Sequence, residues 1–125
     1  MDEISPAGIT DVWEVRGAQV TTWELDPARY GLAIEDAGAL RGGEPGANAE
    51  RIEQLLADGA GEGDAPGLAA VVLNGGAAIY VAGLARSFED GLACARQALA
   101  SGAARAVLDR LRRAAGSATT SRPDG

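Results

Sequence analysis

The sequence contains no histidine and no lysine, and only one cysteine and one phenylalanine among its 125 residues. Without histidine, an imidazole can serve neither as a general base nor as a metal ligand. The lone Cys94 cannot form a disulfide within the chain or build a cysteine-ligated metal cluster. We therefore expect a reducing, cytoplasmic location, with Cys94 as a small buried residue on a helix.

Positive charge is also scarce, because 11 arginines stand against 18 acidic residues and leave a formal net charge of −7. This balance argues against a nucleic-acid-binding surface and against attachment to an anionic membrane. The sequence has no uninterrupted apolar run of transmembrane length, and its acidic start lacks the regions of a signal peptide. We expect neither nucleic acid nor membrane as a partner.

Large apolar side chains are few, although 46% of the sequence is hydrophobic, because 27 of those residues are alanine. Leucine, valine, isoleucine and phenylalanine together account for only 25 residues, which is near the lower limit for a chain that buries its own core. The composition therefore predicts a thin core and apolar surface that another polypeptide covers.

The longest charge-free stretch, Pro66 to Ala85, is expected to be buried, and it has two interpretations. As a strand from Ala69 to Leu73 followed by Asn74-Gly75-Gly76, it resembles a glycine loop that cradles phosphate at a helix N-terminus. As a single helix, its glycines and alanines admit a closely packed neighbour, with Tyr80 hydrogen-bonded at the edge. Periodicity does not separate the two, but the absence of a following Lys and Ser/Thr favours packing.

Residues Ile9 to Asp26 have the pattern of a β-hairpin with Gly17-Ala18 as its two-residue turn. This turn sets a register that places Trp13 opposite Thr22 and Val12 opposite Trp23. Each face of the ribbon then carries one tryptophan, and an isolated ribbon is marginal in water. We expect both tryptophans to pack on later helices rather than to form a stacking site for a base or ring.

The remaining sequence predicts helices separated by glycine-rich turns. The expected segments are a turn from Asp26-Pro27 to Tyr30, a helix bearing Ala49, Ile52, Leu55 and Leu56 that ends at Asp58-Gly59, a polar loop from Gly59 to Gly67, a helix capped by Ser87 that stops at Gly102, and an amphipathic helix from Ala103 to Ala115. Residues 1–115 are thus expected to form one unit, a hairpin followed by several packed helices. Residues 116–125 are predicted to be a disordered tail.

Two adjacent carboxylates, Asp2 and Glu3, open the chain. On extended backbone they point to opposite sides, so they do not form the facing pair of a glycoside hydrolase. They are either solvated surface groups or ligands of a hard cation such as Mg²⁺, which proteins commonly hold through one or two carboxylates plus substrate phosphates. Spacing alone does not decide between these interpretations.

Several segments, read together and in order, resemble the C-terminal part of bacterial anthranilate phosphoribosyltransferases. They are DEISPAG, ELDPARYGL, LRGGEPGANA and VVLNGGAAIYVAGLARSFEDGLACARQALASG, and the resemblance extends from Asp2 to about Ala115. It implies an α/β fold, namely the C-terminal portion of the nucleoside phosphorylase/phosphoribosyltransferase-type α/β domain. Nucleoside phosphorylases share that fold, but the ELDPARYGL segment is more similar to the anthranilate enzymes.

The resemblance also implies an activity and a metal site. This family transfers phosphoribosyl from 5-phosphoribosyl 1-diphosphate to anthranilate in tryptophan biosynthesis, and it uses Mg²⁺. The acidic pair that binds the metal corresponds here to Asp2 and Glu3. The reaction relies on stabilising the leaving pyrophosphate rather than on a side-chain nucleophile, so we expect no catalytic side chain in this chain.

Other parts of the family pattern are missing from these 125 residues. They are the N-terminal helical domain through which the family forms homodimers, the glycine-rich diphosphate loop and the anthranilate-binding residues. We therefore expect the chain to be inactive alone. The alternatives are a non-catalytic interaction module, or one half of a split enzyme that another chain completes.

Overall fold

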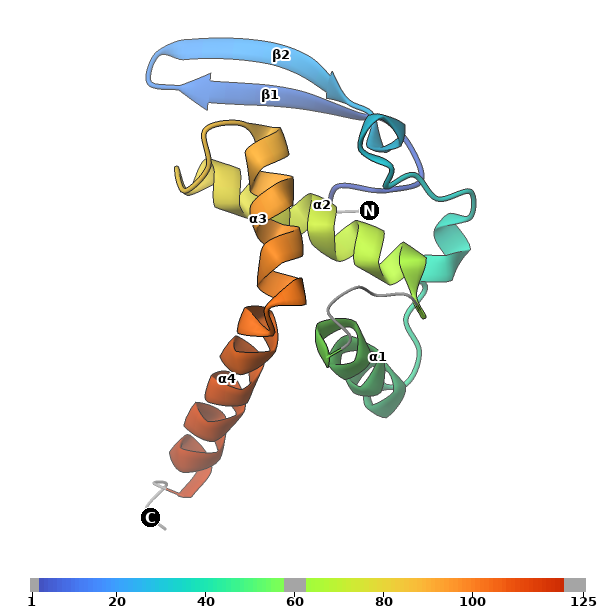
Figure 1. The fold of residues 1–125 in the computed structure, drawn as a ribbon, viewed down its shortest axis with the longest axis vertical. Coiled ribbons are helices and arrows are strands. Elements are labelled where there is room, and N and C mark those ends of the chain that lie inside the picture. Colours follow the sequence, from blue (N-terminus) through green and yellow to red (C-terminus); the bar gives the residue numbers. More distant parts are fainter. Residues whose placement is uncertain (1–2, 58–62, 121–125) are drawn as a thin grey trace, which may run out of the picture.

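The computed structural model describes residues 3–57 and 63–120, which form a small α/β arrangement of one hairpin and four helices. In Figure 1 the hairpin lies across the crossing of α2 and α3, while α4 runs away from α3 and passes near α1. The elements are β1 (Thr10–Arg16), β2 (Gln19–Leu25), the 3₁₀ turns η1 (Pro27–Tyr30) and η2 (Ala37–Leu40), and the helices α1 (Pro45–Ala57), α2 (Ala65–Val81), α3 (Phe88–Ala100) and α4 (Ala103–Thr120). The predicted hairpin followed by packed helices is confirmed.

The hairpin has the predicted register, with Val12 opposite Trp23 and Trp13 opposite Thr22. Gly17 opens the turn with a φ of 60°, in the left-handed region that glycine adopts without strain. Trp23 lies on the inner face, where its ring centroid is 5.7 Å from that of Phe88. Trp13 lies on the outer face and is 67% exposed, so the prediction that both tryptophans pack on helices is wrong for Trp13.

The outer face of the hairpin is apolar and open. Strand side chains alternate between two faces, and the odd-numbered residues of β1 point away from the helices. Four large apolar side chains of this face are each more than half exposed, namely Ile9, Trp13, Val15 and Val20. This open surface agrees with the thin core that the composition predicts.

The stretch from Pro66 is helical as far as Val81, so the packing interpretation is correct and the phosphate-loop interpretation is wrong. Helix α2 begins at Ala65. The side chain of Asp64 caps the helix by accepting a hydrogen bond from the Gly67 amide. The preceding loop therefore ends before Gly67. Asn74-Gly75-Gly76 lies in the middle of the helix, where α2 crosses α3 and glycine lets the two backbones approach.

Burial of this stretch is less complete than predicted. Val72 and Leu73 are fully buried in the core, together with Leu25 of β2 and Leu92 of α3. Val81 is 85% exposed and Leu84 is 77% exposed. These two residues lie at and beyond the C-terminal end of α2, past its crossing with α3, where no described element covers them.

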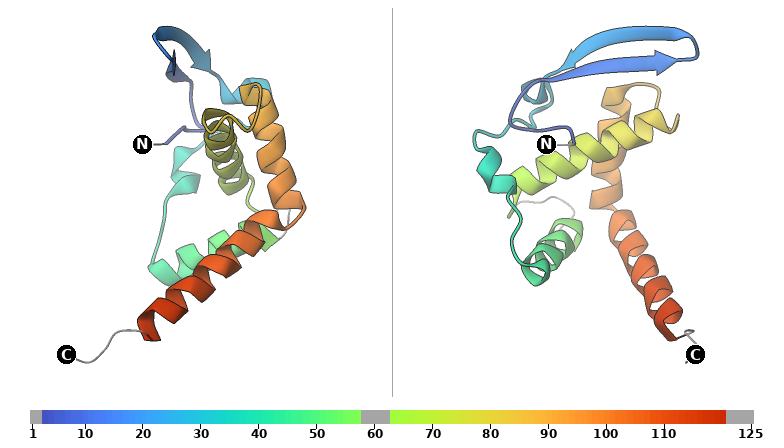
Figure 2. Two further views of the ribbon diagram at one scale, coloured as in Figure 1. Left: turned by 90° about the vertical axis from the view of Figure 1, so that its left-hand side faces the viewer. Right: turned by 180° about the vertical axis from the view of Figure 1, so that it is seen from behind.

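Helix α4 is longer than predicted and forms ion pairs with α1. It ends at Thr120 rather than at Ala115, so residues 116–120 are helical, and residues 121–125 lie outside the described residues. Figure 2 shows α1 and α4 side by side, and Arg105 and Arg112 of α4 both pair with Glu53 of α1. Its apolar stripe stays open, because Val107 is 53% exposed and Leu111 is 65% exposed.

Cys94 is exposed on α3, which corrects the prediction that it is buried. It lies between buried Leu92 and buried Ala95 in sequence, but its side chain points away from the helix face that packs on α2. In the described part of the chain, no helix combines the length and the apolar character needed to cross a bilayer.

Candidate functional site

The acidic pair predicted to bind metal lies at the N-terminal end of the described chain. Asp2 is outside the described residues, and Glu3 is the first residue that the structure places. Glu3 is exposed, and none of the ion pairs formed within residues 3–57 and 63–120 involves it. Its carboxylate oxygens are therefore available to a ligand from solution.

The residue after Glu3 is attached to α2 by a pair of hydrogen bonds. The Ile4 amide donates to Oδ1 of Asn74 over 2.9 Å, and Nδ2 of Asn74 donates to the Ile4 carbonyl over 3.0 Å. The second Nδ2 hydrogen bond goes to the Ala70 carbonyl within the helix, over 2.9 Å. The amide of Asn74 thus has both a donor and an acceptor matched to the backbone of Ile4.

Two further contacts fix the segment that follows Glu3. The Ile4 side chain packs against the core, and Pro6 is fully buried. The Pro6 carbonyl also accepts a hydrogen bond from the Ile34 amide over 3.0 Å. The backbone from residue 4 to residue 6 is therefore held by α2, by the core and by the loop before η2.

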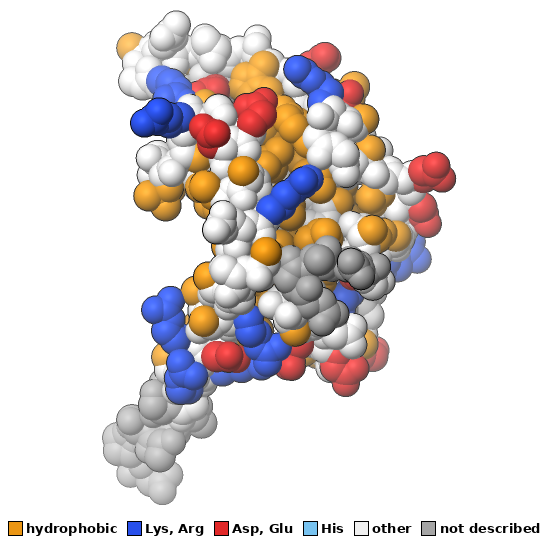
Figure 3. Space-filling view, viewed as in Figure 1, with side chains coloured by type: hydrophobic (Ala, Val, Ile, Leu, Met, Phe, Trp, Pro, Cys, Tyr) orange, Lys and Arg blue, Asp and Glu red, His pale blue; other side chains and the backbone are white. Residues whose placement is uncertain are grey.

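A groove of about 400 Å³ lies between the hairpin and α2. Its lining is mostly apolar and includes Ile4, Val12, Ala77, Val81 and Phe88. In Figure 3 apolar side chains gather beneath the hairpin, with charged side chains at the margins. The groove is bounded on one side by Ile4, the residue next to Glu3.

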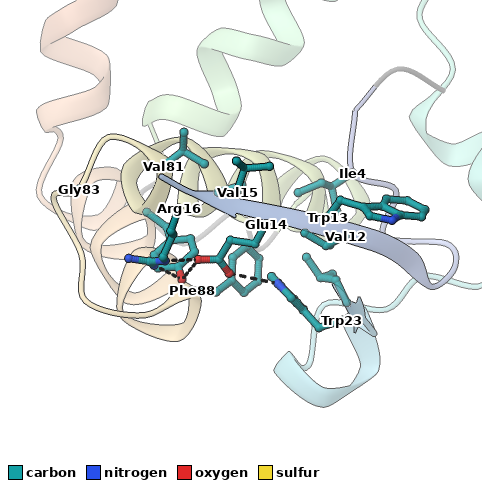
Figure 4. Close-up of a pocket in the computed structure, with 13 residues that line it drawn as sticks. Ile4, Val12, Trp13, Glu14, Val15, Arg16, Trp23, Val81, Gly83 and Phe88 are labelled. Carbon is teal, nitrogen blue, oxygen red and sulfur yellow. Dashed lines mark hydrogen bonds and ion pairs between the residues drawn. The ribbon is translucent and has the colours of Figure 1, made fainter. Parts of the chain in front are cut away.

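A cluster of polar side chains closes one end of this groove. Glu14 accepts hydrogen bonds from the Arg16 guanidinium, from the Tyr80 hydroxyl over 2.8 Å and from the Trp23 indole over 3.3 Å. Figure 4 shows Glu14 lying between Arg16 and Trp23, with Trp13 pointing away. Arg16 also donates to the Tyr80 hydroxyl and lies 5.2 Å from the centroid of its ring.

The hydrogen bonds from Arg16 and Tyr80 hold the pKa of the Glu14 carboxyl below its usual value. The same Glu14 hydrogen bond raises the pKa of Arg16 further. Glu14 therefore stays ionised at neutral pH and its oxygens are already occupied by three donors. This arrangement does not suit Glu14 to act as a general base, and it serves instead to join the hairpin to α2.

The described residues contain no group of three or more His, Cys, Asp or Glu side chains that could hold a metal on its own. The chemistry available near Glu3 is therefore that of a site with few protein ligands.

The sequence predicted the hydrogen-bonded edge position of Tyr80, which is confirmed. It did not predict the partner Glu14, because 66 residues separate the two and only the fold joins them.

Comparison with known proteins shows to which protein family the chain belongs. The model of the family described as "Glycosyl transferase family, a/b domain" matches residues 1–105. The chain therefore belongs to this glycosyl transferase family.

Its relatives then give the particular enzyme that it is similar to. It is 44% identical over 114 residues to the anthranilate phosphoribosyltransferase of Haloferax volcanii, which covers 91% of this chain and 34% of the relative. It is 41% identical over 110 residues to the enzyme of Xylella fastidiosa, covering 88% and 31%. It is 42% identical over 110 residues to anthranilate phosphoribosyltransferase 2 of Streptomyces coelicolor, covering 88% and 32%. The chain thus spans about a third of the length of these curated relatives.

Proposed function

We propose that this chain supplies the C-terminal, metal-binding portion of an anthranilate phosphoribosyltransferase. The reaction joins the amine of anthranilate to the anomeric carbon of 5-phosphoribosyl 1-diphosphate and releases pyrophosphate, in the service of tryptophan biosynthesis. The observation that carries the proposal is the match of residues 1–105 to the family, together with relatives of that name at 41–44% identity. A cytoplasmic location stays a prediction that rests on the lone cysteine.

The donor chemistry at the start of the chain fits Mg²⁺. Asp2 and Glu3 provide only carboxylate oxygens, and Mg²⁺ in phosphate-transferring sites commonly takes one or two carboxylates and completes its shell with waters and substrate phosphates. Glu3 is exposed and forms no ion pair within the part of the chain that the structure describes. When bound, the metal would neutralise charge on the leaving pyrophosphate.

The chain alone does not provide the whole active site. Asn74-Gly75-Gly76 is inside α2 and does not form a glycine loop at a helix N-terminus. We infer that the diphosphate and anthranilate sites belong to the other two thirds of the enzyme, which would also carry the domain for homodimer formation. Joined to that part, the hairpin and helices would complete a nucleoside phosphorylase-type α/β domain.

An activity assay with complementation tests this function. The purified chain is mixed with 5-phosphoribosyl 1-diphosphate, anthranilate and Mg²⁺, and the loss of anthranilate fluorescence is followed. We expect no turnover from the chain alone, and turnover after addition of a polypeptide that carries the remaining two thirds of a relative. Turnover by the chain alone would contradict the proposed division of the active site.

Two acidic variants make the assay specific for the metal site. We expect Glu3→Gln to reduce turnover of the mixture by about 10–100-fold, the scale on which groups that support a metal site act. Glu44→Gln removes one exposed carboxylate at the start of α1 and should leave turnover unchanged. If the mixture forms a complex but shows no activity, the interaction-module alternative is favoured instead.

A further inference from the structure

We propose that Asn74 is the positioning residue for the acidic metal site, because it holds the backbone of Ile4 directly after Glu3. The inference rests on the proposed function, in which Asp2 and Glu3 bind Mg²⁺. It assigns a role to a residue that does not touch the metal or the substrates. Its basis is the geometry of the N-terminal segment against α2.

Asn74 makes both of its contacts with Ile4 through backbone atoms, so the attachment does not depend on the side chain at position 4. The Ile4 amide donates to Oδ1 over 2.9 Å, and Nδ2 donates to the Ile4 carbonyl over 3.0 Å. Two antiparallel hydrogen bonds between one side-chain amide and one residue fix both the position and the direction of that residue. A single hydrogen bond would leave the segment free to rotate about it.

The attachment bridges 70 residues of sequence and links the segment after Glu3 to α2, whose Val72 and Leu73 are in the core. A segment without regular secondary structure stays in one place only where other elements hold its backbone. The hydrogen bond from the Ile4 amide holds the Glu3–Ile4 peptide unit and therefore the position of the Glu3 Cα atom, so the carboxylate moves only by rotation about the Glu3 Cα–C bond and its own side-chain torsions. A metal site with few protein ligands gains affinity when those ligands are held in place before binding.

The placement of asparagine in α2 is otherwise unfavourable. Asparagine lowers helix propensity because its side chain competes for backbone hydrogen bonds. At position 74 this tendency is satisfied by Ala70 within the helix and by Ile4 outside it. Leucine or alanine would suit the helix better, so the asparagine is explained by the segment that it holds.

The chain contains a matched control for this arrangement. Asn48, near the start of α1, makes the same two contacts with another residue, since the Gly43 amide donates to its Oδ1 over 2.8 Å and its Nδ2 donates to the Gly43 carbonyl over 2.9 Å. Both asparagines are half-buried. Removing the Asn48 side chain therefore costs the same pair of hydrogen bonds to one backbone residue, at a place without a proposed metal ligand.

The first part of the experiment measures order at the N-terminus. Asn74→Ala and Asn74→Leu remove the attachment while favouring the helix, and Asn48→Ala and Asn48→Leu are the controls. Amide hydrogen exchange followed by NMR should show the Ile4 amide exchanging about tenfold faster in the Asn74 variants, in line with the modest net value of hydrogen bonds. The Asn48 variants should leave the Ile4 rate unchanged.

The second part uses Mn²⁺ alone as a paramagnetic substitute for Mg²⁺, with which it shares a preference for oxygen ligands. We expect Mn²⁺ to broaden the amide signals around Glu3 and Ile4 in the unmodified chain. The Asn74 variants should need about tenfold more Mn²⁺ for equal broadening, near the lower end of the effect seen for groups that orient metal ligands. In the mixture that turns over, the same variants should raise the apparent KM for Mg²⁺ more than they lower kcat.

Glu3→Gln separates the two proposals. If Mn²⁺ broadening near Glu3 is missing, or is unaffected by Glu3→Gln, the metal site itself is wrong and the role of Asn74 falls with it. If Glu3→Gln abolishes the broadening while the Asn74 variants keep the unmodified response, only the role of Asn74 is overturned. An equal loss in the Asn48 variants would also overturn it, because the effect would then be general loosening.

A last variant tests the attachment without changing any residue of α2. Ile4→Pro removes the Ile4 amide hydrogen, and with it one of the two hydrogen bonds to Asn74, without altering the helix. It should weaken the Mn²⁺ effect in the same direction as Asn74→Ala. Circular dichroism of every variant shows whether the helices persist, and an unchanged Mn²⁺ response in Ile4→Pro would count against the proposal.

Discussion

Gly91 lies so close to Gly76 that a Cβ atom built on Gly91 would stand 2.4 Å from the Gly76 carbonyl oxygen. In the other direction, a Cβ atom on Gly76 would stand 2.9 Å from the Leu92 amide nitrogen. Helices α2 and α3 therefore cross with backbone against backbone, and the pair brings Leu73 and Leu92 into one core. This crossing supports the helix that carries Asn74.

We predict that Gly91→Ala and Gly76→Ala each destabilise the fold. The methyl group on Gly91 meets the Gly76 carbonyl, and the methyl group on Gly76 meets the Leu92 backbone as well as its Cδ2 atom, so the helices must separate. Forcing an extra methyl group into a packed interior typically lowers the free energy of unfolding by about 1–3 kcal/mol. Urea denaturation followed by circular dichroism at 222 nm, the usual helix signal, measures this loss.

The neighbouring Gly75 is the control for the crossing. Its added Cβ atom would lie 3.6 Å from the Ala95 methyl, an ordinary van der Waals distance. Gly75→Ala should leave the free energy of unfolding unchanged or raise it by up to about 1 kcal/mol, because alanine favours helices over glycine. Equal losses at positions 75 and 91 would show that the tight contact is not the cause.

We predict that the capping residue of α2 makes stability depend on pH. Asp64 accepts hydrogen bonds from Arg51 and from the Gly67 amide, and chiefly the Arg51 contact lowers its pKa. Asp64→Asn should keep the cap and lose the ion pair, at a cost below about 1 kcal/mol because the pair is partly exposed and screened. Asp64→Ala should cost about 1 kcal/mol more, because the cap is lost too.

The sign of the pH effect follows from the lowered pKa. The ionised form is favoured in the folded state, so the contribution of Asp64 is complete above about pH 3.9, the ordinary aspartate value. It is lost as the pH falls through the lower folded pKa. The stability difference between the unmodified chain and Asp64→Asn should therefore shrink on acidification in denaturation curves, whereas a difference that grows would contradict the assignment.

The two tryptophans should differ in their effect on stability. Trp23 packs on Phe88 and donates a hydrogen bond to Glu14, whereas Trp13 is 67% exposed on the outer face. We expect Trp23→Ala to lower the free energy of unfolding by about 2–4 kcal/mol, somewhat less than a fully buried aromatic residue. Trp13→Ala should stay within about 0.5 kcal/mol, as surface substitutions do.

Fluorescence provides an independent check on this pair. In the Trp23→Phe variant the remaining Trp13 should be readily quenched by acrylamide. In the Trp13→Phe variant the remaining Trp23 should be quenched less. The reverse order would mean that the hairpin presents its other face to the helices.

Cys94 should react with a thiol reagent in the folded chain. It is exposed on α3, so one equivalent of Ellman's reagent should be consumed without denaturant. Circular dichroism before and after the reaction should be the same. Reaction only in the presence of urea would show that the sequence-based prediction of a buried thiol was right after all.

The sequence predicted those parts of the fold that depend on residues close together in the chain. Gly17-Ala18 fixed the hairpin register, Ser87 fixed the start of α3, and both are confirmed because each depends on residues close in sequence. The sequence-based predictions of burial were wrong where burial depends on which helices and strands pack together. Val81, Trp13 and Cys94 have the composition of interior residues, yet they lie on surfaces that no described element reaches.

The candidate site likewise has residues that the sequence predicted and one that only the fold revealed. Asp2 and Glu3 are visible in the sequence because adjacent carboxylates are a recognisable pattern, although their metal remains a prediction. The role of Asn74 was not visible, since its partner Ile4 is 70 residues away. An asparagine inside an otherwise apolar helix is the signal that would have drawn attention to it.

The shape of α4 has a consequence for how this chain unfolds. This helix has no buried residue among those whose burial is described, and it contacts α1 through ion pairs at Glu53 that salt screens. Its melting therefore removes little apolar surface from the core around Leu73. Helix α4 should fray and reform as a separate cooperative unit, so that one melting temperature does not describe the whole chain.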